Sequence, residues 1–375
     1  MARIRVERAV APGWMRPLIP VVAVIVTFVL TSLLVVLAKA NPLEAYRHFL
    51  ITPLSSRVSF LEVLVKSTPL LLTGSAVAFA FSGGYWNIGA EGQLYAGAIA
   101  AAWLGTQLTE VPAPLAILVM ILGGFLAGVA WAVGPALLKV YLAVDEVVTT
   151  LLLNSVVLFI VSFLLNGPWR DPVSGWPQSP EIAANAVFVK LVPRSRLHLG
   201  FIIGLVAVGL LWLVLSRTVL GLKMRAVGLG PEAARGAGIS VQRTMLTAAL
   251  LSGGIAGVAG VGEVAGIHFH LIEGISPGYG YTGIIVATLG GLSAIGVTLA
   301  ALFIGLIDTG AQTVSRALGV PAYLGDVVQA TLLLVTLGML VLQRYRIRLT
   351  LHSPVKGGRQ DLAVGAGPSG RGDGG

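Results

Sequence analysis

Long apolar runs separated by short polar connectors extend along almost the whole chain. A helix that crosses a lipid bilayer needs about 20 predominantly apolar residues, and runs of this length recur throughout the sequence. The pattern therefore predicts an all-α membrane protein with about ten transmembrane helices. We expect these helices at residues 17–38, 61–81, 90–108, 113–138, 146–165, 198–216, 242–262, 277–292, 295–314 and 323–343.

The composition supports a protein embedded in lipid. Residues are 56% hydrophobic and 11% charged, too few charged groups to cover a soluble core with a hydrated surface. The 48 glycines suit helices that pack closely or break within the membrane. With no cysteine, disulfides and thiol chemistry are excluded. The net charge of +9 follows the membrane topology, so we expect a lipid bilayer and no nucleic acid as the partner.

The distribution of Lys and Arg predicts the orientation. If the predicted helices cross the bilayer in turn, sixteen basic residues gather on one side, in 3–16, at Lys139, in 217–243 and in 344–371, and eight on the other. The richer side is normally cytoplasmic, so both termini are predicted cytoplasmic in a multi-pass protein of the cell membrane. The expected divisions are a cytoplasmic segment 1–16, a transmembrane domain 17–343 and a basic, Gly-rich cytoplasmic tail 344–375.

Two Gly-rich segments, 82–93 and 273–283, interrupt the apolar pattern. Five predicted helices lie between them, so they fall on opposite sides of the membrane, as an inverted five-plus-five repeat with broken helices requires. Irregular backbone inside a bilayer must line a cavity or be buried in protein, which makes both segments candidates for a translocation path. The alternative is two ordinary turns whose aromatic residues anchor them at the membrane surface.

Polar and aromatic residues near the hydrocarbon region are candidates for contact with a transported solute, because such groups are costly there unless they are used. Glu91 has a second interpretation as an N-terminal helix residue stabilised by the helix dipole. Asn154, Asp308 and Lys66 are polar residues inside predicted helices, and each is either a pathway residue or a buried, hydrogen-bonded support. The predicted substrate pathway consists of Tyr85, Trp86, Asn87, Glu91, Gln93, Asn154, Tyr279, Tyr281 and Asp308.

The cytoplasmic connector 217–241 is long and patterned. Pro231 followed by Glu232, two alanines and a Gly stop predicts a short helix of about two turns. A short surface helix can dock in a groove of a cytoplasmic partner and pass its motion to the membrane helices that it joins. A basic loop that only sets topology would explain the charges but not the capped helix.

Three segments together resemble the permease subunits of bacterial ABC importers in the branched-chain amino acid, ribose and simple-sugar group. Residues 87–93, Asn-Ile-Gly-Ala-Glu-Gly-Gln, are similar to the signature of the nucleoside and simple-sugar branch, and the Asp-Leu-Ser-x-Gly string usual in ribose-type permeases is absent. Residues 232–238 partly match the family pattern Glu-Ala-Ala-x-x-x-Gly, without its downstream Ile-x-Leu-Pro. Residues 274–281 resemble the family's segment before the eighth membrane helix.

The resemblance implies an ATP-driven importer in which this chain is a permease subunit. The implied partners are a cytoplasmic ATPase subunit, a second permease subunit and an extracytoplasmic solute-binding protein, for which loop 166–197 is a candidate docking surface. The implied solute is a nucleoside, with simple sugars next. The coupling region 217–241 would contact the ATPase through Arg225, Gly228, Glu232, Ala233, Ala234, Arg235 and Gly238.

No catalytic, metal or cofactor site is expected in this chain. It contains no Gly-Lys-Ser or Gly-Lys-Thr, so ATP hydrolysis must come from partner subunits. A G-x-G-x-x-G string at 278–283 opens a membrane helix rather than following a strand, and His268 and His270 lack the spacing of known metal sites. The alternative function is an ion-coupled secondary transporter, which would share inverted repeats and broken helices but usually needs more intramembrane carboxylates.

Overall fold

The computed structural model describes residues 2–8, 18–321 and 323–351. Every predicted membrane helix coincides with one helix of the structure. These are α1 (Leu18–Leu37), α3 (Arg57–Ser82), α4 (Ala90–Gln107), α5 (Ala113–Leu142), α6 (Glu146–Asn166), α7 (Gly200–Arg217), α10 (Val241–Glu263), α11 (Tyr279–Leu289), α12 (Ala294–Leu318) and α13 (Leu324–Arg344). Shorter elements are α2 (Pro42–Leu50), α8 (Val219–Leu229), α9 (Pro231–Gly236), a π-helical turn (Val264–His268) and 3₁₀ turns at Thr52–Leu54 and Ala184–Ala186.

Six helices are long and apolar enough to cross a membrane by themselves: α3, α5, α6, α7, α12, and α10 with its π-helical turn. Shorter apolar helices occupy Val21–Leu37, Tyr279–Leu289 and Leu324–Met339. The prediction of a multi-pass helical membrane protein is therefore confirmed. The eleven residues of α11, however, are about half of what a full crossing needs, whereas the sequence predicted a full-length helix at 277–292.

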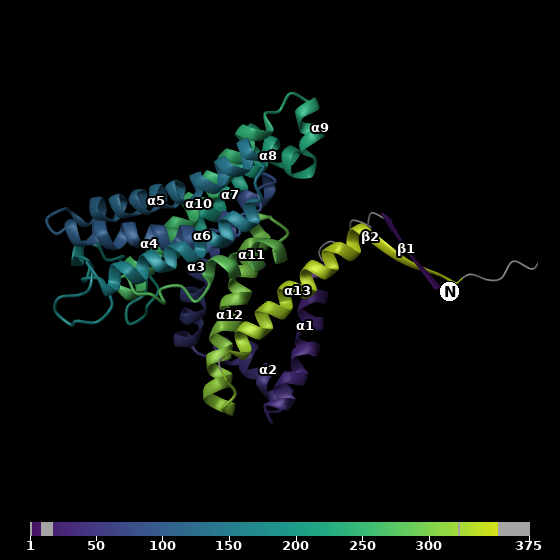
Figure 1. Cartoon of the computed structure of the whole chain (residues 1–375). Helices are drawn as coiled ribbons and strands as arrows, with labels where there is room; N and C mark the ends of the chain where they lie inside the picture. Colours follow the sequence, from purple (N-terminus) through teal and green to yellow (C-terminus); the bar gives the residue numbers. More distant parts are fainter. Residues whose placement is uncertain (1, 9–17, 322, 352–375) are drawn as a thin grey trace, which may run out of the picture.

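Two helices, α3 and α10, form the centre of the bundle and pack against each other (Figure 1). α10 also packs on α4 and α5, while α3 packs on α11 and α12. The apolar window of α3 is 89% buried, compared with 22% for α6 and 28% for both α5 and α7. The outer helices therefore present apolar side chains such as Leu126, Leu152 and Phe159 to the surroundings, as lipid contact requires.

Glycines allow α5 and α10 to pack backbone to backbone. A Cβ at Gly128 would lie 2.1 Å from the carbonyl oxygen of Gly253, and one at Gly257 would lie 2.2 Å from that of Gly124. Both distances are too short for any side chain, so only glycine fits. The two G-x-x-x-G strings at 124–128 and 253–257 thus face each other in close helix packing.

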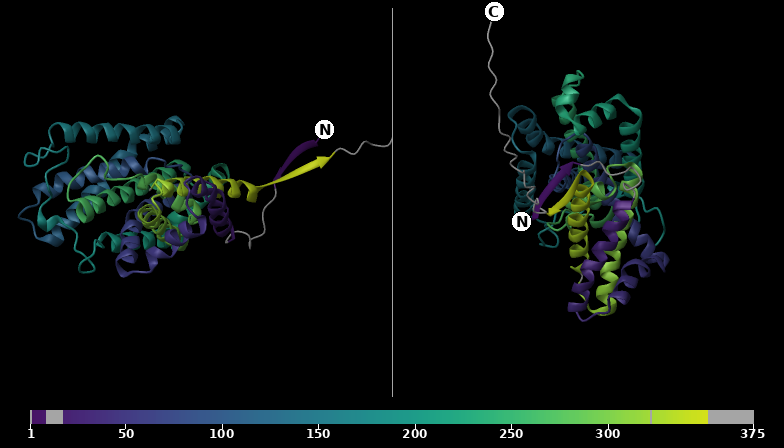
Figure 2. Two further views of the ribbon diagram at one scale, coloured as in Figure 1. Left: turned by 90° about the horizontal axis from the view of Figure 1, so that it is seen from below. Right: turned by 90° about the vertical axis from the view of Figure 1, so that its right-hand side faces the viewer.

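The first and last segments that the structure describes, residues 2–8 and 345–351, are strands, which the all-α prediction missed. β1 (Ala2–Arg8) pairs antiparallel with β2 (Tyr345–Leu351), with Ala2 opposite Leu351. Both segments alternate apolar and polar residues, the period-two pattern of a strand. Because α1 also packs along α13, the chain enters and leaves the bundle at the same end (Figure 2). The predicted tail beyond residue 351 lies outside the described residues.

Candidate functional site

The break between α3 and α4, residues 83–89, is held by a buried asparagine. The Asn87 side-chain amide donates to Oε1 of Gln93 and to Oγ of Ser252 on α10, both at 2.8 Å. Its Oδ1 accepts the backbone N–H of Gly89 at 2.9 Å. Asn87 is completely buried, so these contacts replace water and fix the irregular backbone to α10.

Asn154 on α6 joins three other segments. Its Nδ2 donates to the carbonyl of Ile88 and to the hydroxyl of Tyr281 on α11, both at 3.0 Å. Its Oδ1 accepts the backbone N–H of Gly92 in the first turn of α4 at 2.9 Å. Every hydrogen-bonding position of this buried amide except one lone pair is thus used to hold α4, α6 and α11 together.

The N-termini of α4 and α11 meet inside the bundle. The Glu91 carboxylate in the first turn of α4 accepts the backbone N–H of Gly280, in the first turn of α11, at 2.6 Å. A Cβ at Gly280 would lie only 2.1 Å from the backbone nitrogen of Glu91. Both helix ends carry partial positive charge, so a carboxylate between them is favourable.

The two Gly-rich segments reach this meeting point from opposite ends of α10. In the first segment, Gly84 contacts the coupling region at Gly228. Residues 269–271, which lead into the second segment, pair with the loop between α6 and α7 through backbone bonds from Ser179 and Ile182. The sequence predicted that the segments lie on opposite sides, but not that they touch. The contact of Glu91 with Gly280 brings them together in the interior.

Besides Tyr279, five of the predicted pathway residues are buried inside the protein, namely Tyr85, Asn87, Glu91, Gln93 and Asn154. All but Tyr85 hydrogen-bond to other parts of the protein, and none of the five lines the cavity described below. Trp86 is 54% exposed at the surface and Tyr281 is 40% exposed. Contact of these seven residues with a solute stays a prediction.

The other two predicted pathway residues, Tyr279 and Asp308, line one cavity of about 210 Å³. It lies between α3, α11, α12 and α13, and Gln329 on α13 donates to the Asp308 carboxylate. The Oγ1 of Thr282 donates to Oε1 of Gln329 at 3.4 Å. Lys66, which the sequence left open as a pathway residue or a support, also lines the cavity. The sequence interpretation missed the rest of the lining, which includes Pro277, Thr282, Ala311, Gln312, Tyr323, Gly325, Asp326 and Gln329. Polar residues within apolar runs, Gln329 above all, were the available signal.

The coupling region projects from one end of the bundle as α8 and α9 (Figure 1). α9 begins with Pro231 in its first turn, which confirms the predicted short helix. Glu232 and Arg235 form an exposed ion pair at 2.7 Å, while the buried Ala234 packs against Val227. Arg225 and Ala233 are exposed beside them, and Gly238 ends the turn with a φ of 79° that favours glycine.

Gly228 brings the coupling region against the α3–α4 break. A Cβ at Gly228 would lie 2.5 Å from the carbonyl oxygen of Ser82, the last residue of α3. From the other side, a Cβ at Gly84 would lie 3.4 Å from Cα of Gly228. The backbone of α8 therefore touches the start of the break directly, with no side chain between them.

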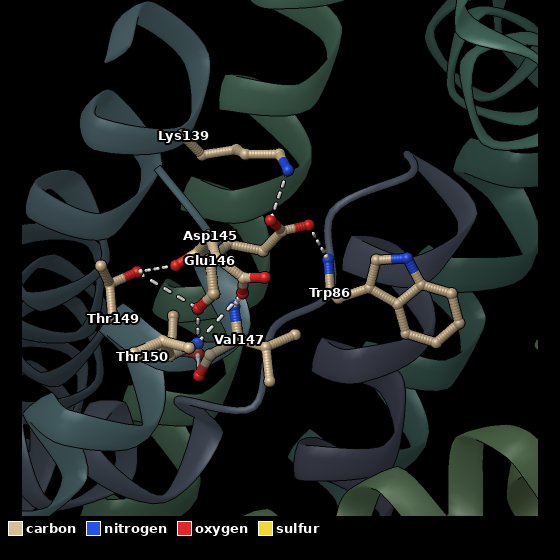
Figure 3. A network of polar contacts seen from close by, with 8 residues as sticks. Trp86, Lys139, Asp145, Glu146, Val147, Thr149 and Thr150 are labelled. Carbon is tan, nitrogen blue, oxygen red and sulfur yellow. Dashed lines mark hydrogen bonds and ion pairs between the residues drawn. The ribbon is translucent and has the colours of Figure 1, made fainter. Parts of the chain in front are cut away.

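A polar cluster ties the same break to the start of α6 (Figure 3). Glu146, in the first turn of α6, pairs with Lys139 near the end of α5 at 2.5 Å and accepts the backbone N–H of Trp86 at 3.3 Å. Asp145 caps the helix by accepting the N–H of Val147 at 2.8 Å. The buried carboxylate of Glu146 thus connects α5, α6 and the break.

Comparison with known proteins identifies the family. The family described as branched-chain amino acid transport system / permease component matches residues 59–337. The glucose ABC transporter permease protein TsgB13 of Haloferax volcanii is 35% identical over 91% of this chain and 92% of its own length. The guanosine ABC transporter permease protein NupP of Bacillus subtilis is 35% identical over 79% of this chain and 84% of its own.

The nucleoside ABC transporter permease protein NupB of Lactococcus lactis is 32% identical over 84% of this chain and 89% of its own length. No solved structure matches the chain. The matches cover the helices that carry the interior network, the cavity and the coupling region. The chain therefore belongs to the family described as branched-chain amino acid transport system / permease component, a family of ABC transport subunits in the membrane rather than of enzymes.

Proposed function

We propose that this chain is one permease subunit of an ATP-driven importer for nucleosides, with simple sugars as the next solute class. The observation that carries the proposal is the identity of about a third, over most of the chain, to permeases named for guanosine, nucleosides and glucose. The three relatives named above are ABC transporter permeases, which disfavours the ion-coupled alternative.

The second permease of the importer is a different chain in this proposal. Bacillus subtilis has a guanosine permease NupQ that is 25% identical to this chain, beside NupP at 35%. Lactococcus lactis has a nucleoside permease NupC at 28%, beside NupB at 32%. A pair of unequal relatives in one organism supports a heterodimer in which this chain takes the place of the more similar member.

Ten membrane segments in an inverted five-plus-five arrangement fit the helix packing. α3 packs on α11 and α12, and α10 packs on α4 and α5, so the second and seventh predicted spans have reciprocal neighbours. Each of these two helices is followed by a Gly-rich break. Two related halves would give this reciprocal packing if each half packed its second helix on the other half.

Both termini and the coupling region lie on the cytoplasmic side in this proposal. The paired β1 and β2 support a common side for the two ends, and the excess of Lys and Arg supports the cytoplasm. An ATPase subunit would dock at α8 and α9. A solute-binding protein would dock at the opposite end, where loop 166–197 packs over residues 265–272.

Closure of the ATPases would move α8 and α9 as a rigid lever. Because Gly228 touches Ser82 and Gly84, the push would reach the α3–α4 break, and Glu146 would pass it to α6. The chain would then alternate between outward-open and inward-open states without forming a covalent bond to the solute.

The test is uptake of labelled guanosine, glucose and leucine by cells that lack this chain. Deletion is expected to abolish uptake of guanosine or glucose and to leave leucine uptake unchanged, and a plasmid copy is expected to restore it. Loss of leucine uptake with normal guanosine and glucose uptake would overturn the assigned solute class.

A further inference from the structure

The cavity between α3, α11, α12 and α13 combines hydrogen-bond acceptors and donors within the membrane domain. Asp308 and Asp326 supply carboxylates, Lys66 supplies an ammonium group and Gln329 supplies an amide. Gln329 already donates to Asp308, which holds both side chains in place. A sugar hydroxyl both donates and accepts, so adjacent hydroxyls match such a mixed lining.

The same surroundings disfavour an anionic solute. In transporters with broken helices, an anionic group usually binds at the free N-terminus of a half-helix. At α11 these N–H groups are occupied: the hydroxyl of Ser276 accepts from Gly278 at 3.2 Å and from Tyr279 at 2.9 Å, and Glu91 accepts from Gly280. The two carboxylates of the cavity would also repel a phosphate.

The size of the cavity suits one part of a solute molecule rather than the whole molecule. Its volume of about 210 Å³ is below the roughly 300–1,000 Å³ typical of pockets that enclose whole drug-sized ligands. Tyr279 and Tyr323 add aromatic rings to the polar lining, and Tyr323 is 78% exposed. A sugar ring needs such a combination, because it carries hydroxyls at its edge and C–H groups on its faces.

We propose that this cavity is the subsite that holds the sugar ring of the transported solute, a neutral ring with adjacent hydroxyl groups. The inference rests on the proposed function: glucose and guanosine, for which two relatives are named, have only such a ring in common. The subsite reads the hydroxyls through Asp308 and Gln329 and is indifferent to the nucleobase, which extends beyond the cavity.

The test uses the complete importer in cells and compares guanosine with 2′,3′-dideoxyguanosine, which lacks the adjacent hydroxyls. In Asp308→Asn and Gln329→Leu, guanosine uptake is expected to fall about tenfold, the scale of one lost hydrogen bond to a charged group, while uptake of the dideoxy analogue changes less than twofold. The ratio of guanosine uptake to dideoxyguanosine uptake, which measures the preference for hydroxyls, is therefore expected to fall. Gln107→Leu, an exposed amide at the end of α4, is the matched control and is expected to keep the wild-type preference.

Tyr323→Ala is a second variant that keeps the inference testable if the buried variants fail to fold, because this exposed side chain supports no packing of the core. Its guanosine uptake is expected to fall at least threefold. Wild-type preference in all folded variants, or equal loss for both nucleosides, would overturn the subsite. Competition by leucine that depends on Asp308 would overturn it in favour of a zwitterion site between Lys66 and the carboxylates. If the wild-type importer took up neither guanosine nor glucose, the proposed function itself would fail.

Discussion

At the scale of single residues, buried side-chain amides hydrogen-bond to irregular backbone in the protein interior. Asn154 replaces water for the carbonyl of Ile88 and the N–H of Gly92, and Asn87 does so for the N–H of Gly89. Both residues were candidates for solute contact, and Asn154 was also a candidate for structural support. Their hydrogen bonds favour the structural role in this conformation, because little capacity is left for a solute.

Replacing Asn154 by Leu is expected to lower stability strongly. The change leaves the N–H of Gly92 and the carbonyl of Ile88 without their partner, at a cost of about 1–3 kcal/mol for each buried group. The measurement is the midpoint of thermal unfolding in detergent. Gln107→Leu, an exposed amide at the end of α4, is the control and should stay within about 0.5 kcal/mol of wild type. Equal midpoints for the two variants would contradict the structural role.

Replacing Gly228 is expected to impair the coupling of ATPase closure to transport and to leave insertion of the chain into the membrane unchanged. In Gly228→Ala the new methyl group would lie 2.5 Å from the carbonyl of Ser82 and push α8 away from the break. Solute uptake should fall at least tenfold while the amount of protein in the membrane and its co-purification with the ATPase stay near wild type. Gly209→Ala on α7, where the added Cβ meets nothing within 4 Å, should transport normally. Full uptake by Gly228→Ala would remove this contact from the mechanism.

At the scale of elements, α4 and α11 meet end to end through Glu91 and Gly280. α11 is too short to cross a bilayer alone, and residues 273–278 precede it as irregular backbone. Glu91 stabilises that arrangement because its charge lies at two positive helix ends. The two breaks therefore act as one structural unit, although they belong to different halves of the chain.

Gly280→Ala is expected to break this unit. The methyl group cannot fit 2.1 Å from the backbone of Glu91, so the two helix ends must separate, and overpacking of this kind costs about 1–3 kcal/mol or more. Size-exclusion chromatography of detergent extracts should show a loss of the monodisperse fraction. Gly134→Ala on α5, where nothing lies within 4 Å of the added Cβ, should elute like wild type. A monodisperse and active Gly280→Ala would contradict the close approach.

At the scale of the whole molecule, the orientation can be tested cleanly because the chain has no cysteine. Val173→Cys, in the exposed loop between α6 and α7, is expected to react with a membrane-impermeant maleimide in intact cells. Leu229→Cys, exposed at the end of α8, is expected to react only after the cells are permeabilised. The reverse labelling pattern would invert the topology and remove α9 as a site for a cytoplasmic ATPase.

The positions of the helices follow from the sequence because the apolar runs and the turn residues that end them are local. Pro231 likewise identified α9 correctly. Contacts between distant segments could not be predicted, since Glu91 and Gly280 are 189 positions apart and nothing local pairs them. The strands at the two ends were missed because only their charges were considered, although their residues alternate in character.

The candidate site was predicted only in part, for the same reason. Tyr279 and Asp308 were selected as polar or aromatic groups near the hydrocarbon region, and both line the cavity. Their neighbours Lys66 and Gln329 come from other helices, so their place in the cavity depends on how four helices pack. Residues such as Asn87 carried the same signal but satisfy one another instead.

The most direct test of ATP-driven import is transport by the purified importer in proteoliposomes. The permease pair and the ATPase are reconstituted, with the solute-binding protein and labelled guanosine or glucose outside and ATP inside. An ATP-driven importer is expected to accumulate the labelled solute only when ATP is present inside, and not when a proton or sodium gradient is the only energy source. Accumulation driven by such a gradient without ATP would contradict ATP-driven import.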